Sequence, residues 1–99
     1  MPRPSALDEH EVSERLEKLK SWTIRNGKLH RTFVFKDFAA AFAFMTDVAR
    51  EAEILDHHPE WSNVYNRVEM NLVTHDPPGI TSLDFELAQR ADRLAERRQ

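Results

Sequence analysis

Three of the five histidines of this chain, His57, His58 and His75, lie close together in the sequence. Among side chains, imidazole has the unperturbed pKa nearest to neutrality, so it can give or take a proton at physiological pH. Glu53 precedes the adjacent pair by about one helical turn, and a nearby carboxylate of this kind can orient an imidazole and stabilise its protonated form. These residue types at this spacing therefore suit acid–base chemistry.

Three interpretations of the histidines are open from the residues alone. They can be structural, because histidine is common near the C-terminus of a helix. They can bind a metal ion together with Glu53, Asp76 or Asp84, although adjacent histidines are awkward ligands for one ion and the usual helical spacing is absent. They can transfer protons, and no serine motif, Gly-rich phosphate loop or cysteine competes for that role. The pattern favours acid–base chemistry without a metal or cofactor, and it names no substrate.

The adjacent pair lies where a helix is expected to give way to a strand. Pro59 pushes the residue before it out of helical geometry. The alanine-rich segment from Asp37 to Leu55 has apolar residues at helical spacing, and Asp37 is expected to cap that helix. Phe38 and Phe42 are interpreted as part of its buried stripe.

His75 ends a segment of alternating apolar and polar residues. Residues 61–65 and 67–75 predict a second antiparallel pair of strands joined around Asn66, and residues 76–79 predict a loop. Thr81 is expected to cap the last helix, with Asp84 completing a capping box. The histidines would therefore lie at the ends of a helix and a strand, which are natural rims of a cleft.

The residues before position 37 complete the scaffold. Asp8 and Glu11 have the spacing of a capping box for an amphipathic helix that ends near Lys20. Asn26-Gly27 lies between two alternating segments and predicts a β-hairpin with a type I′ turn.

The predicted order is α-β-β-α-β-β-α. Two hairpins with short connections favour an α+β, two-layer fold, in which three helices cover one face of a four-stranded antiparallel sheet. The open face of the sheet and its free edges leave room for self-association.

Composition bounds the remaining possibilities. The 99 residues are expected to form one domain, 1–99, with residues 1–6 as a loose tail that contains two prolines. A net charge of −3 argues against a direct nucleic-acid partner, and the lack of cysteine excludes disulfides and thiolate chemistry. No apolar run is long enough to span a bilayer, and the first residues lack the apolar core of a signal peptide. The sequence predicts a soluble cytoplasmic protein without a membrane partner.

The segment around the histidines resembles a known family, the pterin-4a-carbinolamine dehydratases. The resemblance is carried by Glu53-x-x-x-His57-His58-Pro59-x-Trp61-x-Asn63-Val64-Tyr65-Asn66-x-Val68, followed by Leu72-x-Thr74-His75. The Asn-Gly hairpin and the segment around Asp84 also fit, so that the resemblance covers nearly the whole chain.

This resemblance implies the α+β fold already expected and an activity without a cofactor. The activity is dehydration of 4a-hydroxytetrahydrobiopterin to quinonoid dihydropterin and water, a step that recycles the pterin used by aromatic amino acid hydroxylases. The pterin would lie among three histidines, with His57 and His75 as the acid–base pair and His58 orienting the ring.

The resemblance also assigns residues that bind the substrate. Glu53 and Asp84 match acidic pocket positions of the family, and Asp56, Thr74 and Asp76 would line the same cleft. Trp61 and Tyr65 match the motif and are expected mainly to pack.

Specificity and partners follow from the same resemblance. Leu83 stands where some relatives carry an arginine just before the acidic residue, so a charged pocket contact is not expected there. The family forms dimers and tetramers, which makes a homodimer or homotetramer the expected state. The alternative function is a non-catalytic protein-binding scaffold, because some members act as dimerisation cofactors for a transcription factor and degenerate relatives assist Rubisco assembly. All three histidines are present, which favours the enzyme.

Overall fold

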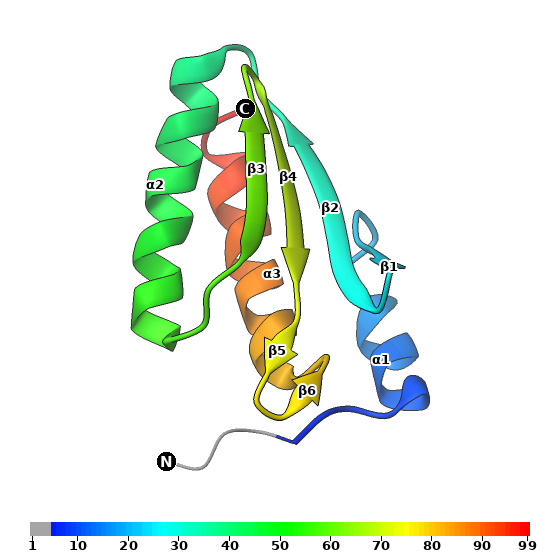
Figure 1. The fold of residues 1–99 in the computed structure, drawn as a ribbon. Helices are drawn as coiled ribbons and strands as arrows, with labels where there is room; N and C mark the ends of the chain where they lie inside the picture. Colours follow the sequence, from blue (N-terminus) through cyan, green and yellow to red (C-terminus); the bar gives the residue numbers. More distant parts are fainter. Residues whose placement is uncertain (1–4) are drawn as a thin grey trace.

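The computed structural model describes residues 5–99 (Figure 1). The elements of this part of the chain are α1 (Glu9–Leu16), β1 (Thr23–Arg25), β2 (Lys28–Val34), α2 (Phe38–Leu55), β3 (Glu60–Val64), β4 (Arg67–Leu72), β5 (Thr74–His75), β6 (Pro78–Gly79) and α3 (Ser82–Glu96). The predicted order of helices and longer strands is confirmed. Of the predicted tail, residues 1–4 lie outside the described residues, and residues 5 and 6 are exposed and have no regular structure.

The four longer strands form one antiparallel sheet in the order β1-β2-β4-β3. At its centre β2 pairs with β4, with Leu29 opposite Leu72. Asn26 and Gly27 have φ values of 54° and 76°, and these positive angles are what a type I′ turn requires at both positions. The predicted hairpin is therefore confirmed, as is the joining of β3 to β4 around Asn66.

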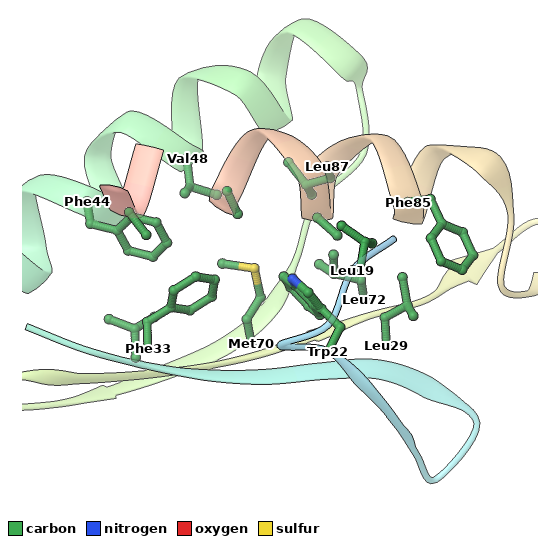
Figure 2. Packing of buried hydrophobic residues seen from close by; sticks show 14 of the residues in the cluster. Leu19, Trp22, Leu29, Phe33, Phe44, Val48, Met70, Leu72, Phe85 and Leu87 are labelled. Atoms are coloured by element: carbon green, nitrogen blue, oxygen red, sulfur yellow. The ribbon is translucent and has the colours of Figure 1, made fainter. Parts of the chain in front are cut away.

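α2 and α3 lie side by side over one face of the sheet (Figure 1). α1 lies close to α3, and the guanidinium of Arg15 is 6.0 Å from the centre of the Phe85 ring. The buried residues of the sheet that face the helices are Leu29, Phe33, Val68, Met70 and Leu72, and they pack with Phe44, Val48, Phe85 and Leu87 from α2 and α3 (Figure 2). The two-layer α+β fold is confirmed, with its core between the sheet and these helices.

α2 begins where the sequence predicted. The carboxylate of Asp37 accepts a hydrogen bond from the backbone N–H of Ala40 at 2.8 Å, which satisfies one of the free donors at the helix N-terminus. Trp22 and Asp92 provide a further link between the sheet and the helices, because the Trp22 Nε1–H donates to Asp92 Oδ1 at 2.8 Å.

The first turns of α2 face the core with other residues than predicted. Phe38 and Phe42 are 48% and 54% exposed, so their interpretation as core is wrong. The buried residues are Ala41, Phe44, Val48 and Ala52, a stripe displaced by one residue around the helix. A small alanine at position 41 lets α2 approach its neighbours closely. The exposed rings of Phe38 and Phe42 contact each other, with centroids 5.7 Å apart.

Other predicted details need correction as well. α1 ends at Leu16, before the predicted Lys20, because residues 17–21 form turns that carry the buried Leu19 into the core. Tyr65 is 61% exposed and does not pack as expected, since it occupies the turn between β3 and β4 with a φ of 50°. In contrast, Trp61 packs against the core.

The segment predicted as a loop at residues 76–79 contains a strand. β6 pairs with β5, with Thr74 opposite Gly79 and His75 opposite Pro78. Gly79 has a φ of 121°, a backbone conformation that glycine adopts far more easily than other residues. His75 therefore lies in a small second hairpin beyond the end of β4, and not at the end of one long strand.

None of the helices described in residues 5–99 is long and apolar enough to cross a membrane.

Candidate active site

The end of α2 carries the chain to the histidine pair through a left-handed residue. Asp56 caps the helix with φ 49° and ψ 47°, a conformation that aspartate adopts more often than most residues. The backbone N–H of His57 donates to the carbonyl of Ala52 at 3.0 Å and closes the last turn. Pro59 cannot continue a helix. His57 and His58 therefore leave α2 at fixed positions, in agreement with the predicted junction.

The histidine pair shares one cleft with His75 of the β5–β6 hairpin. The cleft has a volume of about 290 Å³ and is lined by Asp56, His57, His58, Val73, Thr74, His75 and Asp76. This volume is near the lower end of the range for small-molecule pockets, about 300–1,000 Å³. Six of the eight predicted site residues line the cleft; Glu53 and Asp84 do not line it, but each contacts one of its histidines.

Two larger hollows of about 410 and 460 Å³ lie between the C-terminal end of α3 and α2, the first beside the middle of α2 and the second beside its start. Both are lined in part by Arg97 and Arg98, and neither lining contains a histidine. The chemistry of the lining residues, and not size, therefore identifies the cleft at the histidines as the candidate site.

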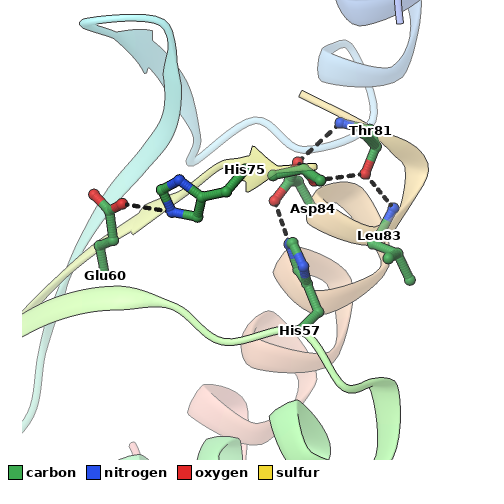
Figure 3. A network of polar contacts seen from close by, with 7 residues as sticks. His57, Glu60, His75, Thr81, Leu83 and Asp84 are labelled. Atoms are coloured by element: carbon green, nitrogen blue, oxygen red, sulfur yellow. Dashed lines mark hydrogen bonds and ion pairs between the residues drawn. The ribbon is translucent and has the colours of Figure 1, made fainter. Parts of the chain in front are cut away.

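Asp84 contacts two residues that line this cleft, His57 and Thr74, and Figure 3 shows its contact with His57. Its side chain is fully buried at the start of α3. Its Oδ1 lies 2.5 Å from His57 Nε2, while its Oδ2 accepts hydrogen bonds from the Thr74 hydroxyl and the Thr81 backbone N–H, both at 2.8 Å. The predicted capping box is confirmed. One carboxylate thus joins α3, β5 and the end of α2.

This arrangement assigns the ring nitrogens of His57. A carboxylate that serves several partners at once acts as an acceptor only, so Nε2 of His57 is the nitrogen that carries hydrogen and donates to Asp84. Nδ1 is then the nitrogen without hydrogen. Burial and the bond to Asp84 together hold the ring, because the His57 side chain is only 5% exposed.

Each of the other two histidines also has a carboxylate partner. His58 Nε2 lies 2.6 Å from Glu53 Oε2, and both side chains are exposed. His75 Nε2 lies 3.2 Å from Glu60 Oε2 (Figure 3). The other oxygen of Glu60 accepts a hydrogen bond from Lys28 Nζ at 2.5 Å. All three imidazoles are therefore oriented by carboxylates from different elements.

Glu60 is held in its charged form by its neighbours. The hydrogen bond from Lys28 lowers the pKa of the Glu60 carboxyl below 4.5, and the charges of Lys28 and His75 act in the same direction. Partial burial opposes this shift without overcoming it. Glu60 is consequently an anion at neutral pH and acts on His75 as an acceptor.

Sequence reasoning missed Glu60. It precedes Trp61 within the recognised motif, but its contact with His75 depends on how β3, β4 and the β5–β6 hairpin are placed relative to one another. Leu83 does not belong to the lining of the cleft; its backbone N–H donates to the Thr81 hydroxyl at 3.2 Å.

Within residues 5–99, no group of three or more histidine, cysteine, aspartate or glutamate side chains has an arrangement that could hold a metal ion. The carboxylates beside the histidines instead engage them one to one.

Comparison with known proteins shows the same pattern over nearly the whole chain. The sequence model of the family described as pterin 4 alpha carbinolamine dehydratase matches residues 5–94. The chain belongs to the pterin-4a-carbinolamine dehydratase family. This is a family of hydro-lyases, so the expected enzyme class is supported by membership.

Individual relatives agree with this membership. A protein of Solibacter usitatus named "Putative pterin-4-alpha-carbinolamine dehydratase" is 53% identical over 89 residues, which are 90% of this chain and 94% of the relative. A protein of Rhizobium meliloti with the same name is 50% identical over 98 residues, 97% of this chain and 94% of the relative. A crystal structure from Brucella melitensis, described as a transcriptional coactivator/pterin dehydratase, is 45% identical with a TM-score of 0.89 and covers 92% of this chain and 99% of its own.

Proposed function

We propose that this protein dehydrates 4a-hydroxytetrahydrobiopterin to quinonoid dihydropterin and water. The observation that supports the proposal best is the single cleft lined by His57, His58 and His75 in a member of the pterin-4a-carbinolamine dehydratase family. The three side chains supply groups that exchange protons near neutral pH, and the reaction requires such groups.

The reaction needs two proton transfers. The bond between C4a and the hydroxyl oxygen breaks, and the hydroxyl leaves as water after it accepts a proton from an acid. The proton on N5 passes to a base, and the nitrogen lone pair forms the C4a–N5 double bond. We assign the acid–base pair to His57 and His75, which line the same cleft. The step is redox-neutral, so its chemistry requires no cofactor.

The remaining residues bind and orient the pterin. His58 would hold the ring, with Glu53 fixing the direction of its imidazole at 2.6 Å. Asp56, Thr74 and Asp76 contribute the rest of the polar lining. Thr74 also donates to Asp84, so its hydroxyl links the lining to the buried carboxylate.

The proposal includes a setting for this activity. The chain acts as one domain, because residues of α1, α2, α3 and the larger sheet share one core. It works in the cytoplasm as a homodimer or homotetramer, in a pathway that serves an aromatic amino acid hydroxylase. Support for self-association comes from Phe38 and Phe42 of α2, which are about half exposed and whose ring centroids lie 5.7 Å apart. Adjoining apolar side chains on a surface are typical of protein contacts.

The test is stopped-flow absorbance of synthetic 4a-hydroxytetrahydrobiopterin mixed with the wild-type protein. We expect dehydration well above the spontaneous rate, and we expect that rate to survive exhaustive treatment with a chelator. A folded protein that leaves the spontaneous rate unchanged would contradict the proposal. Loss of the rate on chelation, with recovery on addition of a metal ion, would contradict metal-free acid–base catalysis.

The alternative function is a non-catalytic protein-binding scaffold, as a transcriptional dimerisation cofactor or assembly factor. The relative from Brucella melitensis, described as a transcriptional coactivator/pterin dehydratase, is the observation that favours it. A wild-type protein that is folded and oligomeric but inactive on the pterin would support this alternative.

A further inference from the structure

His75 differs from His57 in how its ring is held. The His75 side chain is 80% exposed and projects from the short strand β5, whereas burial holds His57. An exposed side chain retains several rotamers in solution, and fixing one of them costs conformational entropy. A partner is therefore needed if the ring of His75 is to keep one orientation before substrate binds.

Glu60 is that partner, and it is itself held in place. One of its oxygens contacts His75 Nε2 at 3.2 Å and the other accepts from Lys28 Nζ at 2.5 Å. Glu60 begins β3 and Lys28 begins β2, so the carboxylate connects the two strands on either side of β4 to the β5–β6 hairpin. The Glu60 side chain is 40% exposed, half as much as that of His75.

The contact also selects a form of the imidazole. An anionic carboxylate can only accept, so its approach to 3.2 Å from Nε2 favours the tautomer of neutral His75 that carries the hydrogen on Nε2 and leaves Nδ1 as the basic nitrogen. Glu60 does not line the cleft, and it therefore acts on the reaction through His75 and not by touching the substrate.

We propose that Glu60, held by its hydrogen bond from Lys28, is a positioning residue that fixes the ring orientation and the tautomer of His75 for proton transfer in the cleft. The catalytic part of this inference rests on the proposed dehydratase activity. Neither residue was assigned to the site by the sequence, and neither lines the cleft.

Two readouts test the inference on Glu60→Ala and Glu60→Gln. The first is the ¹⁵N chemical shifts of the His75 ring, which report the tautomer: we expect mainly hydrogen on Nε2 in the wild type and a mixture in Glu60→Ala. The second is steady-state kinetics, where we expect kcat to fall about tenfold in Glu60→Ala while KM changes less than about twofold. Lys28→Met is expected to change both readouts in the same direction and to a smaller extent.

Glu69→Gln is the matched control, because Glu69 lies on β4 with its side chain on the same open face, in the next row of the sheet, opposite Ser62. It is expected to leave the His75 tautomer and kcat unchanged.

An unchanged His75 tautomer in both Glu60 variants would overturn the inference whether or not the protein is a dehydratase. A mixed tautomer with full kcat would also overturn it, since Glu60 would then orient a ring whose orientation does not matter for the rate. An inactive wild type would instead contradict the proposed function, and the ring shifts would still decide the role of Glu60.

Discussion

Asp84 has three polar partners in a position without solvent exposure, so its side chain takes part in both the fold and the candidate site. An interpretation as a helix cap and an interpretation as a site residue were both open from the sequence. The structure combines the two, because the oxygen that caps α3 and the oxygen that contacts His57 belong to the same carboxylate.

Replacing this carboxylate by an amide tests its structural part. In Asp84→Asn the side chain has one acceptor oxygen and an NH₂ group that must face a former donor, so a buried polar group loses its partner. We expect the free energy of unfolding to fall by about 1–3 kcal/mol, measured by urea denaturation. Glu53→Gln is the control: its partner His58 is exposed, and a change within about 0.5 kcal/mol is expected. Equal stability of Asp84→Asn and wild type would contradict the network.

Glu60 predicts a dependence of stability on pH. Its pKa in the folded protein is lowered, chiefly by the hydrogen bond from Lys28. A carboxyl with a lowered folded pKa stabilises the fold above its unfolded pKa, and the contribution is lost as pH falls through the folded pKa. We expect wild type to have a higher Tm than Glu60→Gln at about pH 6, and the difference to shrink steadily as the solution is acidified and Glu60 takes up its proton.

Because the pair is partly exposed, the difference in Tm is expected to be small. Lys28→Met is the control: in that background the Glu60→Gln change should alter the Tm at about pH 6 much less than it does in the wild type. A difference that grows on acidification would have the wrong sign and would contradict the account of Glu60.

Six of the predicted site residues line the cleft because the motif in the sequence fixes local geometry. Asp56 ends the helix next to the histidines in a left-handed conformation, and Pro59 keeps the chain after them out of a helix. Glu60 could not be identified in this way, because its contact with His75 requires the register of three strands and the break between β4 and β5. Such contacts arise from tertiary structure, and no regular spacing of residues in the sequence indicates them.

Among the elements, the starts of α2 and α3 were predicted from their caps, and both caps are present. The buried face of α2 was predicted wrongly at Phe38 and Phe42, since the apolar residues of the helix cover two adjacent stripes and periodicity alone does not choose between them. The choice is made by packing: Phe44 lies against Phe33 and Phe35, with ring centroids 4.7 and 4.9 Å away.

The cap of α2 offers a test at the scale of one element. Asp37→Ala removes the acceptor for the Ala40 N–H, and we expect a loss of about 1 kcal/mol in the free energy of unfolding. Lys36→Ala, at the exposed neighbouring position outside the helix, should have little effect. A loss of the same size in both variants would show that the cap does not contribute specifically.

For the whole molecule, the exposed aromatic pair on α2 is the proposed contact between copies. We expect the double variant Phe38→Ser, Phe42→Ser to shift the protein to a smaller species in sedimentation velocity at equal concentration, because the contact loses apolar area. Ile24→Ser, which changes an exposed apolar residue on β1, is the control and should keep the wild-type species. An unchanged species in the double variant would place the contact on another surface.

The central claim is that His57 and His75 act together as the acid–base pair of a dehydratase. The most direct measurement is the rate of dehydration of 4a-hydroxytetrahydrobiopterin by stopped-flow absorbance for wild type, His57→Ala and His75→Ala. His10→Ala is the control, since His10 lies exposed on α1 and pairs with Glu14. We predict that each cleft variant, verified as folded by circular dichroism, loses about a hundredfold or more in kcat while His10→Ala keeps the wild-type rate. Folded His57→Ala and His75→Ala proteins with wild-type kcat would contradict the account.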